Sequence, residues 1–277
     1  MYMYLRFVYE KNLFAAAMDR YDICNKDHII ITARESVYFT PRTWFMFKTF
    51  GHDPAKIHLM QGSIEQWMEQ GGEVDTDPVV APTFQGLEPP EHVRSDGDGD
   101  GETEGDECFR YKYNYNTREA TNVCKMDEVL AAIENNNNQN GEKNDDHTDD
   151  DDNRDQVLIL DSRGSSFAKG HMPGAIHLPY ANWVSSSPSS SSPKNSNTST
   201  LKWKPINELK QIFIDAGVDP LTDQKIICSC GTGVSVCHTL LALELCGRDL
   251  QNQDKTTMYD ASWSEWGMMK TTPRASL

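Results

Sequence analysis

A cysteine at position 230 stands in a setting that can support nucleophilic chemistry. It follows the short apolar run 226–228 and Ser229, and it precedes Gly231, Thr232 and Gly233. The run predicts a buried strand, and glycine after it allows backbone N–H groups to turn toward the cysteine. Such donors, together with the N-terminus of a following helix, stabilise an anion. We therefore expect Cys230 to be held as a thiolate, which is the nucleophilic form of cysteine.

The rest of the loop offers further contacts for a bound sulfur anion. The hydroxyls of Thr232 and Ser235 can donate hydrogen bonds to it, and the backbone from Gly231 to Val234 can bind an incoming anionic substrate. The competing interpretation is a structural cysteine, because free cysteine is commonly buried in protein cores. The spacing favours a reactive Cys230 over a structural one.

Three other chemistries fit this segment less well. A zinc site built from Cys228, Cys230, Cys237 and His238 has poor geometry, since neighbouring helical residues point about 100° apart. The spacing of Cys228 and Cys230 is not that of a CxxC dithiol. Cysteine phosphatases place an arginine six residues after the nucleophile to bind phosphate bidentately, and here that residue is Val236. We expect neither a metal nor a cofactor.

The acidity of the chain is concentrated in spacers. Of the net charge of −16, the windows 95–107 and 142–155 together carry −13, so the remaining residues carry only −3. Windows this polar and repulsive do not pack into a core, and we interpret them as solvated segments. The near-neutral remainder argues against nucleic acid or an anionic membrane as a partner.

Three features predict a protein of a reducing compartment. No apolar run is long enough to span a bilayer. The first residues lack the basic region, apolar region and cleavage site of a secretory signal. The 7 cysteines are an odd number without regular spacing, which favours free thiols over a disulfide framework. We expect a cytoplasmic or mitochondrial protein that is not secreted.

The elements around this loop occur twice along the chain. The first block predicts a strand over 27–33, a helix over 42–50 that Thr40 caps, a strand over 55–60 and a helix that Ser63 caps. The second block predicts the same order: a strand over 224–229, a helix over 234–245, a strand over 255–260 and a helix from 262.

An internal duplication explains this recurrence. An ungapped alignment that places Gly51 on Gly247 brings Arg34 onto Cys230, so only the second copy has a thiol at this position. The second block also has an additional front half, with an apolar strand over 156–163.

Alternating strands and helices predict an α/β fold with a doubly wound parallel sheet. We expect one complete C-terminal domain and a partial N-terminal copy of it. The predicted boundaries are a partial, non-catalytic domain over 1–76, an acidic linker over 77–108 and a catalytic domain over 109–277, with disordered inserts near 135–155 and 185–200.

Several motifs in the right order resemble the rhodanese superfamily, and within it the two-domain 3-mercaptopyruvate and thiosulfate sulfurtransferases. The segment CGTGVS is similar to the active-site loop of the mercaptopyruvate enzymes. The segments DSR, GHMPGAIHLPY and YDASWSEWG resemble family signatures, and FGHDPAKIHLMQGSIEQWMEQGGEVD resembles the end of the non-catalytic domain. The resemblance covers roughly 7–76 and 109–277 apart from the inserts.

The resemblance implies a ping-pong transfer of sulfur. Cys230 takes sulfur from a donor and becomes a persulfide, and a thiol such as thioredoxin or glutathione, or cyanide, then removes it. Thiosulfate enzymes usually have basic residues after the cysteine, whereas Gly231 and Thr232 are neutral, which favours 3-mercaptopyruvate as the donor. Thr232 takes the place of a loop serine that assists proton transfer.

The resemblance also implies a supporting shell of polar residues. Asp161, Arg163, His171 and Asp260 occupy signature positions and are interpreted mainly as scaffold, with Arg163 also a candidate for substrate binding.

The sequence departs from the family pattern in two places. The segment after Arg163 is short and offers Lys169 in place of the donor-binding arginines. The first block lacks the opening half of a rhodanese domain, which normally sends polar groups to the active-site loop. These departures motivate the alternative of a catalytically impaired binding or regulatory module.

Overall fold

The computed structural model describes residues 11–33, 37–77, 122–141, 156–188, 199–252 and 254–277. Most of the predicted linker 77–108 and the aligned Arg34 lie outside this part of the chain. In the described part, no helix is both long enough and apolar enough to cross a membrane.

The first block forms the order of elements that the sequence predicts. After α1 (Lys11–Arg20), which was not predicted, come β1 (Ile29–Ile31), α2 (Thr40–Thr49), β2 (Ile57–Leu59) and α3 (Ile64–Glu69). β1 and β2 pair in parallel, with Ile29 opposite Ile57. Gly51 follows α2 with a φ of 84°, which is the left-handed conformation that glycine adopts readily at a helix end.

Of the two predicted helix caps of this block, Thr40 is wrong and Ser63 is confirmed in position only. The N-cap of α2 is Phe39, so Thr40 is already helical, and the proline in the first turn is as expected. Ser63 does occupy the N-cap of α3 but makes no capping hydrogen bond, and its Oγ is buried without a partner. The chain before Thr40 enters through a 3₁₀ turn, η3 (Val37–Phe39), which shifts the helix start by one residue.

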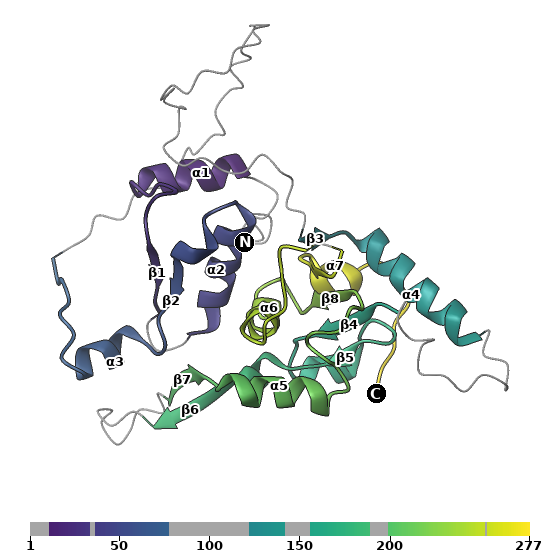
Figure 1. Ribbon diagram of the computed structural model, residues 1–277. Helices are drawn as coiled ribbons and strands as arrows, with labels where there is room; N and C mark the ends of the chain where they lie inside the picture. Colours follow the sequence, from purple (N-terminus) through teal and green to yellow (C-terminus); the bar gives the residue numbers. More distant parts are fainter. Residues whose placement is uncertain (1–10, 34–36, 78–121, 142–155, 189–198, 253) are drawn as a thin grey trace, which may run out of the picture.

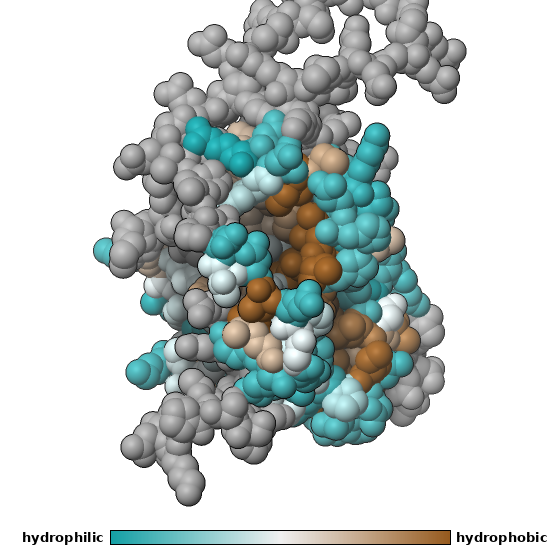
Figure 2. Space-filling view, turned by 90° about the vertical axis from the view of Figure 1, so that its left-hand side faces the viewer, coloured by the Kyte–Doolittle hydropathy of each residue, from teal (hydrophilic) through white to brown (hydrophobic). Residues whose placement is uncertain are grey.

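One side of the first block is left open. β1 and β2 make a two-stranded sheet, so within the described residues each strand has an edge with no partner strand. Figure 2 shows apolar residues gathered in a hollow on this side of the molecule, and Ile30 of β1 is 68% exposed. Apolar sheet surface of this kind is normally covered in a complete α/β domain.

The second block is built on a parallel sheet of five strands in the order β3-β9-β8-β4-β5. The strands are β3 (Val123–Cys124), β4 (Leu158–Asp161), β5 (Ile176–His177), β8 (Ile226–Ser229) and β9 (Thr256–Tyr259). β8 is central, with Ile227 opposite Ile159 of β4 on one side and Thr257 of β9 on the other.

Helices cover both faces of this sheet, as the sequence predicts. Ile226 and Cys228 belong to one apolar cluster, together with residues of α5 (Ile206–Asp215) and α6 (Val236–Leu245). Ile227, between them, belongs to a second cluster with residues of α4 (Met126–Gly141) and α7 (Ser262–Trp266). Because successive strand residues point to opposite faces, this division shows a sheet buried on both sides.

Parts of both predicted inserts form regular secondary structure, while the rest of each lies outside the described residues. α4 continues to Gly141, well into the predicted insert 135–155. The Asn136 side chain explains this: it accepts from the Val157 N–H at 3.0 Å and donates to the Val157 carbonyl at 2.8 Å, which ties the helix to the approach of β4. The second insert begins and ends in an antiparallel pair, β6 (Val184–Pro188) with β7 (Ser199–Trp203).

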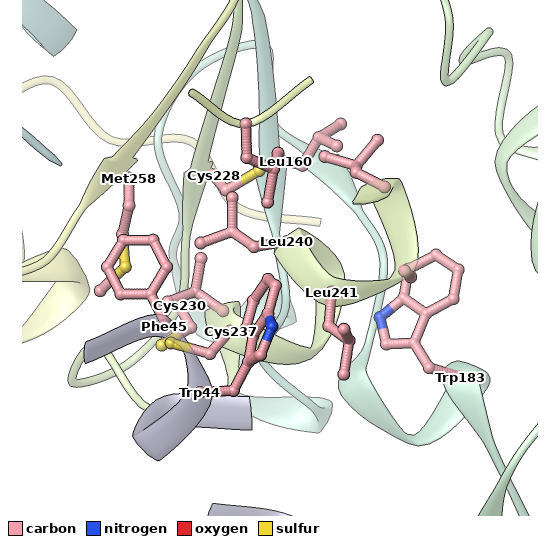
Figure 3. Packing of buried hydrophobic residues seen from close by; sticks show 14 of the residues in the cluster. Trp44, Phe45, Leu160, Trp183, Cys228, Cys230, Cys237, Leu240, Leu241 and Met258 are labelled. Carbon is pink, nitrogen blue, oxygen red and sulfur yellow. The ribbon is translucent and has the colours of Figure 1, made fainter. Parts of the chain in front are cut away.

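The two blocks share a core. α2 packs beside α6 at the centre of the molecule (Figure 1). Trp44 and Phe45 of α2 belong to the same buried cluster as Cys230 and Cys237, and they lie beside both cysteines in Figure 3. The first block is therefore packed directly against the segment that the sequence singles out for chemistry.

Candidate active site

Cys230 lies directly after the central strand β8. The chain runs outward from β4 to β5 on one side of the sheet and from β8 to β9 on the other. Ligands of doubly wound sheets bind beyond the carboxyl ends of the strands at such a switch point. Asp161–Arg163 ends β4 and begins the neighbouring loop, so the two segments with the candidate residues meet at this edge.

The Cys230 sulfur has two polar neighbours within the described residues. The Gly233 N–H donates to Sγ at 3.2 Å, and the Ser262 Oγ lies 3.8 Å from Sγ. The Cys230 residue is only 1% exposed and belongs to the apolar cluster shared by the two blocks. The sulfur thus accepts the Gly233 N–H and lies near the Ser262 hydroxyl inside a largely apolar environment.

Of the backbone N–H groups that the sequence analysis expected to face the Cys230 sulfur, one is seen to do so. In the described loop, the Gly233 N–H is the backbone donor to Sγ, and this geometry requires the left-handed φ of 81° at Gly233. The Cys230 backbone instead bonds to the segment after β9: its N–H donates to Ser262 Oγ at 3.1 Å, and its carbonyl accepts from the Trp263 N–H at 3.0 Å. The first residues of α7 therefore bind the loop through its backbone, a contact that the sequence analysis did not predict.

The other loop residues occupy different environments. Gly231 is half-buried beside the aliphatic part of Arg163, and its carbonyl accepts from the Ser264 N–H at 2.9 Å. Thr232 is exposed at the tip of the loop, and Val234 is half-buried. Thr232 is therefore placed to meet a molecule that arrives from solvent.

Ser235 contacts a tyrosine of the first block. It is the N-cap residue of α6, and its side chain is hydrogen-bonded to Tyr38. Burial raises the pKa of Tyr38, and the nearby Cys230 and Tyr180 raise it further. The Tyr38 ring also contacts Tyr180 and His238, with centroids 5.0 and 5.5 Å away. The predicted hydrogen bond from Ser235 to the sulfur is not among those seen.

Asp161 and Arg163 form a buried ion pair, in agreement with the scaffold interpretation. Nε and Nη2 of Arg163 donate to the Asp161 carboxylate at 2.7–3.0 Å, and Nη2 also donates to the Gly170 carbonyl at 2.9 Å. The guanidinium lies 4.4 Å from the centroid of the Trp263 ring. Because Arg163 is 5% exposed and so engaged, its predicted contact with substrate stays a prediction.

His171 serves the scaffold in the same way. Its Nδ1 lies 3.2 Å from the Phe167 carbonyl, and its ring stacks on the Phe167 ring at 4.0 Å. Its backbone pairs with Ala275 near the end of the chain. These contacts account for the histidine without a role in proton transfer.

The other cysteines of this block are held in their neutral form. Burial raises the pKa of Cys237 to about 12 and that of Cys124 to about 11, and it raises the pKa of Cys228 strongly. Among the described residues there is no group of three or more side chains that could hold a metal ion.

Residues 143–269 match the family model of the rhodanese-like domain. The chain contains a rhodanese-like domain. The match confirms the predicted rhodanese-like domain, and the parallel sheet covered by helices confirms the predicted α/β fold.

Relatives of the rhodanese-like chain include sulfurtransferases. A thiosulfate sulfurtransferase of Gallus gallus is 24% identical over 260 residues, covering 91% of this chain and 68% of that protein. A 3-mercaptopyruvate sulfurtransferase of Escherichia coli K12 is 25% identical over 262 residues, covering 94% and 72%. The crystal structure of SseA from Escherichia coli superposes with a TM-score of 0.54 at 23% identity, covering 90% and 72%. The chain thus spans part of the length of each.

Sequence reasoning missed several residues that hold the Cys230 loop from other segments, among them Arg42. Arg42, in the first turn of α2, donates through Nη1 to Asp260 Oδ1 at 2.6 Å and to the Gly233 carbonyl at 3.0 Å. The first block therefore does send polar groups to the loop, through Arg42 and Tyr38. The available signal was a basic residue in the first turn of a helix that is otherwise apolar on almost every side.

Two further buried groups line this part of the rhodanese-like domain. Asp260 follows β9 and is 2% exposed; burial raises the pKa of its carboxyl, while the Arg42 guanidinium opposes that shift. His238 of α6 is 1% exposed, and burial lowers its pKa to about 4. His238 is therefore neutral at physiological pH, and its Nδ1 has no hydrogen-bond partner within the described part of the chain.

Proposed function

We propose that this protein is a sulfurtransferase that carries sulfur as a persulfide on Cys230. The observation that carries the proposal is the 3.2 Å hydrogen bond from the Gly233 N–H to the Cys230 sulfur at the end of the central strand. A donor in this position stabilises negative charge on sulfur, both in the free thiolate and in the persulfide anion. The sulfurtransferase names of the relatives agree with this chemistry.

The proposed reaction proceeds in two half-reactions. The Cys230 thiolate attacks the sulfur of 3-mercaptopyruvate, an S–S bond forms, and the donor's C–S bond breaks with its electron pair going to carbon. The resulting pyruvate enolate takes up the proton that the donor thiol carried, which leaves pyruvate and the Cys230 persulfide anion. An acceptor thiolate then attacks the outer sulfur, and Cys230 leaves as a thiolate.

The neutral loop supports 3-mercaptopyruvate over thiosulfate as the donor. Residues 231–235 contain no cation, and Lys169 in the neighbouring loop is exposed. A divalent anion such as thiosulfate gains more from a positive side chain than a monovalent carboxylate does. We propose a thiol such as glutathione or thioredoxin as the acceptor, in a cytoplasmic or mitochondrial setting, because the described cysteines are free.

Intact-protein mass spectrometry tests the proposal. After incubation with 3-mercaptopyruvate and removal of the excess, the protein should gain the mass of one sulfur atom, and an added thiol should remove it. The Cys230→Ser variant should show neither the adduct nor pyruvate release, whereas Cys24→Ser, which changes a free thiol in the first block, should behave as the wild type. An adduct of unchanged yield in Cys230→Ser would refute the proposal.

The burial of the thiol favours a second candidate, a rhodanese-like binding module with little catalytic activity. A Cys230 residue that is 1% exposed offers limited access to a donor. In this case iodoacetamide should alkylate Cys230 no faster than it alkylates a cysteine in a short peptide. Faster alkylation, together with the sulfur adduct, supports the enzyme.

A further inference from the structure

Arg42 links the first block to the residue that holds the sulfur. Its Nη1 donates to the carbonyl of Gly233, and the N–H of the same glycine donates to Cys230 Sγ. Only the Gly233 Cα lies between these two hydrogen bonds. The orientation of the amide at the sulfur therefore depends on a side chain that enters from about 190 residues earlier in the chain.

Asp260 also packs against Gly233. A Cβ at Gly233 would lie 2.7 Å from the Asp260 carbonyl, closer still to Asp260 Oδ1, and 3.4 Å from Arg42 Nη1. The backbone of Gly233 is thus pressed against both members of the Arg42–Asp260 ion pair. The Cys237 thiol adds a third contact, because it donates to the Gly233 carbonyl at 3.5 Å.

The Arg42–Asp260 ion pair is shielded from water, so water cannot take the place of Arg42 as a partner of the carboxylate. Arg42 is 9% exposed and Asp260 is 2% exposed. Within the described residues, Oδ2 of Asp260 has no hydrogen-bond partner, and Arg42 binds this carboxylate through Oδ1. A carboxylate buried in this way requires its cation, and removal of the cation would displace both the carboxylate and the glycine that rests on it.

From this juxtaposition we infer that Arg42 is a positioning residue for sulfur transfer, which makes the first block a working part of the active site. Arg42 holds the Gly233 carbonyl in place, and the left-handed φ of 81° at Gly233 then directs its N–H toward Cys230 Sγ, while the guanidinium itself contacts Asp260 and the loop carbonyl rather than the donor. This inference rests on the proposed function for its kinetic consequence, although the geometry of the Gly233 amide can be measured without it.

Two matched variants on α2 test whether Arg42 positions the Gly233 amide or only stabilises the packing of the first block on the second. Arg42→Met removes the loop contact and keeps the length of the side chain. Lys48→Met breaks a partly buried ion pair of the same helix, whose partner Glu244 belongs to α6 and lies outside the loop 230–235. If Arg42 only stabilised the contact between the two blocks, the two variants would change kcat to a similar extent.

The expected results are specific to Arg42. Arg42→Met should lower kcat by roughly 10- to 100-fold with little change in KM, because a lost amide contact weakens the transition state more than donor binding. Lys48→Met should retain a kcat close to that of the wild type. Arg42→Lys should recover part of the loss, since a single nitrogen of Arg42 makes the contacts with both Gly233 and Asp260.

Amide hydrogen exchange gives a measurement that does not require sulfur transfer. The Gly233 amide should exchange at least about tenfold faster in Arg42→Met than in the wild type or in Lys48→Met. Equal protection of Gly233 in all three proteins would overturn the inference, as would equal losses of kcat in the two methionine variants. If no protein shows sulfur transfer but Gly233 loses protection only in Arg42→Met, the proposed function fails and the positioning role stands.

Discussion

Ser262 lies beneath Cys230 and contacts it at both its backbone and its sulfur. The Ser262 Oγ accepts the Cys230 N–H at 3.1 Å and lies 3.8 Å from Sγ, while it donates to the Tyr259 carbonyl at 2.8 Å. Ser262 holds this position with a φ of 54°, which is uncommon for a residue with a side chain. The start of α7 thus supports the nucleophile through a residue in a strained conformation.

We predict that Ser262→Ala destabilises the protein by about 1–3 kcal/mol, because it leaves the buried Cys230 N–H without an acceptor. Ser262→Gly removes the same hydroxyl but relieves the positive φ, so it should be about 1 kcal/mol more stable than the alanine variant. Both should form the sulfur adduct more slowly than the wild type. Thermal denaturation and the rate of adduct formation measure the two effects; equal stability of the two variants would contradict the role of strain.

Gly233→Ala should abolish sulfur transfer. An alanine at a φ of 81° costs about 1–2 kcal/mol, and its Cβ would collide with Asp260 and disturb Arg42. We expect a loss of stability of about 2 kcal/mol or more and no detectable persulfide. Gly164→Ala is the matched control, because no heavy atom lies within 4 Å of a Cβ there. An active Gly233→Ala variant would show that the loop does not need this conformation.

The stability of the protein should fall as the pH drops below about 6.5, because of His238. Burial lowers its pKa from 6.5 to about 4, so between these values the unfolded chain binds the proton more tightly than the folded chain. The contribution is fully present above pH 6.5 and is lost toward pH 4, with a limit on the order of 3 kcal/mol.

His238→Phe should remove this part of the pH dependence while it keeps an aromatic ring beside Tyr38 and Tyr180. Urea denaturation at several pH values measures the slope of stability against pH. His58→Gln, at an exposed site on β2, serves as the control and should retain the slope of the wild type. A His238→Phe protein with an unchanged slope would assign the pH dependence to other groups.

Donor selectivity should respond to charge at Thr232. This residue is exposed at the tip of the loop, so Thr232→Lys adds a cation there without burying it. The ratio of kcat/KM for thiosulfate to that for 3-mercaptopyruvate should rise by roughly 5- to 10-fold, which corresponds to about 1 kcal/mol for an exposed charge. Thr232→Gln controls for side-chain length. An unchanged ratio would show that the charge of the loop does not select the donor.

Local patterns in the sequence predicted most of the framework. The β-branched runs at Ile29–Ile31 and Ile226–Ser229 form strands, and the glycines at 51, 71 and 247 follow helices with positive φ. Caps were less well predicted, because whether Ser63 or Thr40 bonds to a backbone N–H depends on how the chain enters the helix. The extension of α4 through a run of asparagines was missed for a related reason: it depends on the contact between Asn136 and Val157.

The sequence by itself determined that a thiol follows a buried strand at a glycine turn, since apolar runs, glycines and helix starts act through neighbours in the chain. Only the tertiary structure decided what holds that thiol. Ser262 contacts Cys230 across 32 residues of sequence, and Arg42 contacts Gly233 across 191 residues and Asp260 across 218. Such contacts leave no periodic signal, because they arise when separate segments are packed into one core and buried charges and N–H groups must find partners there.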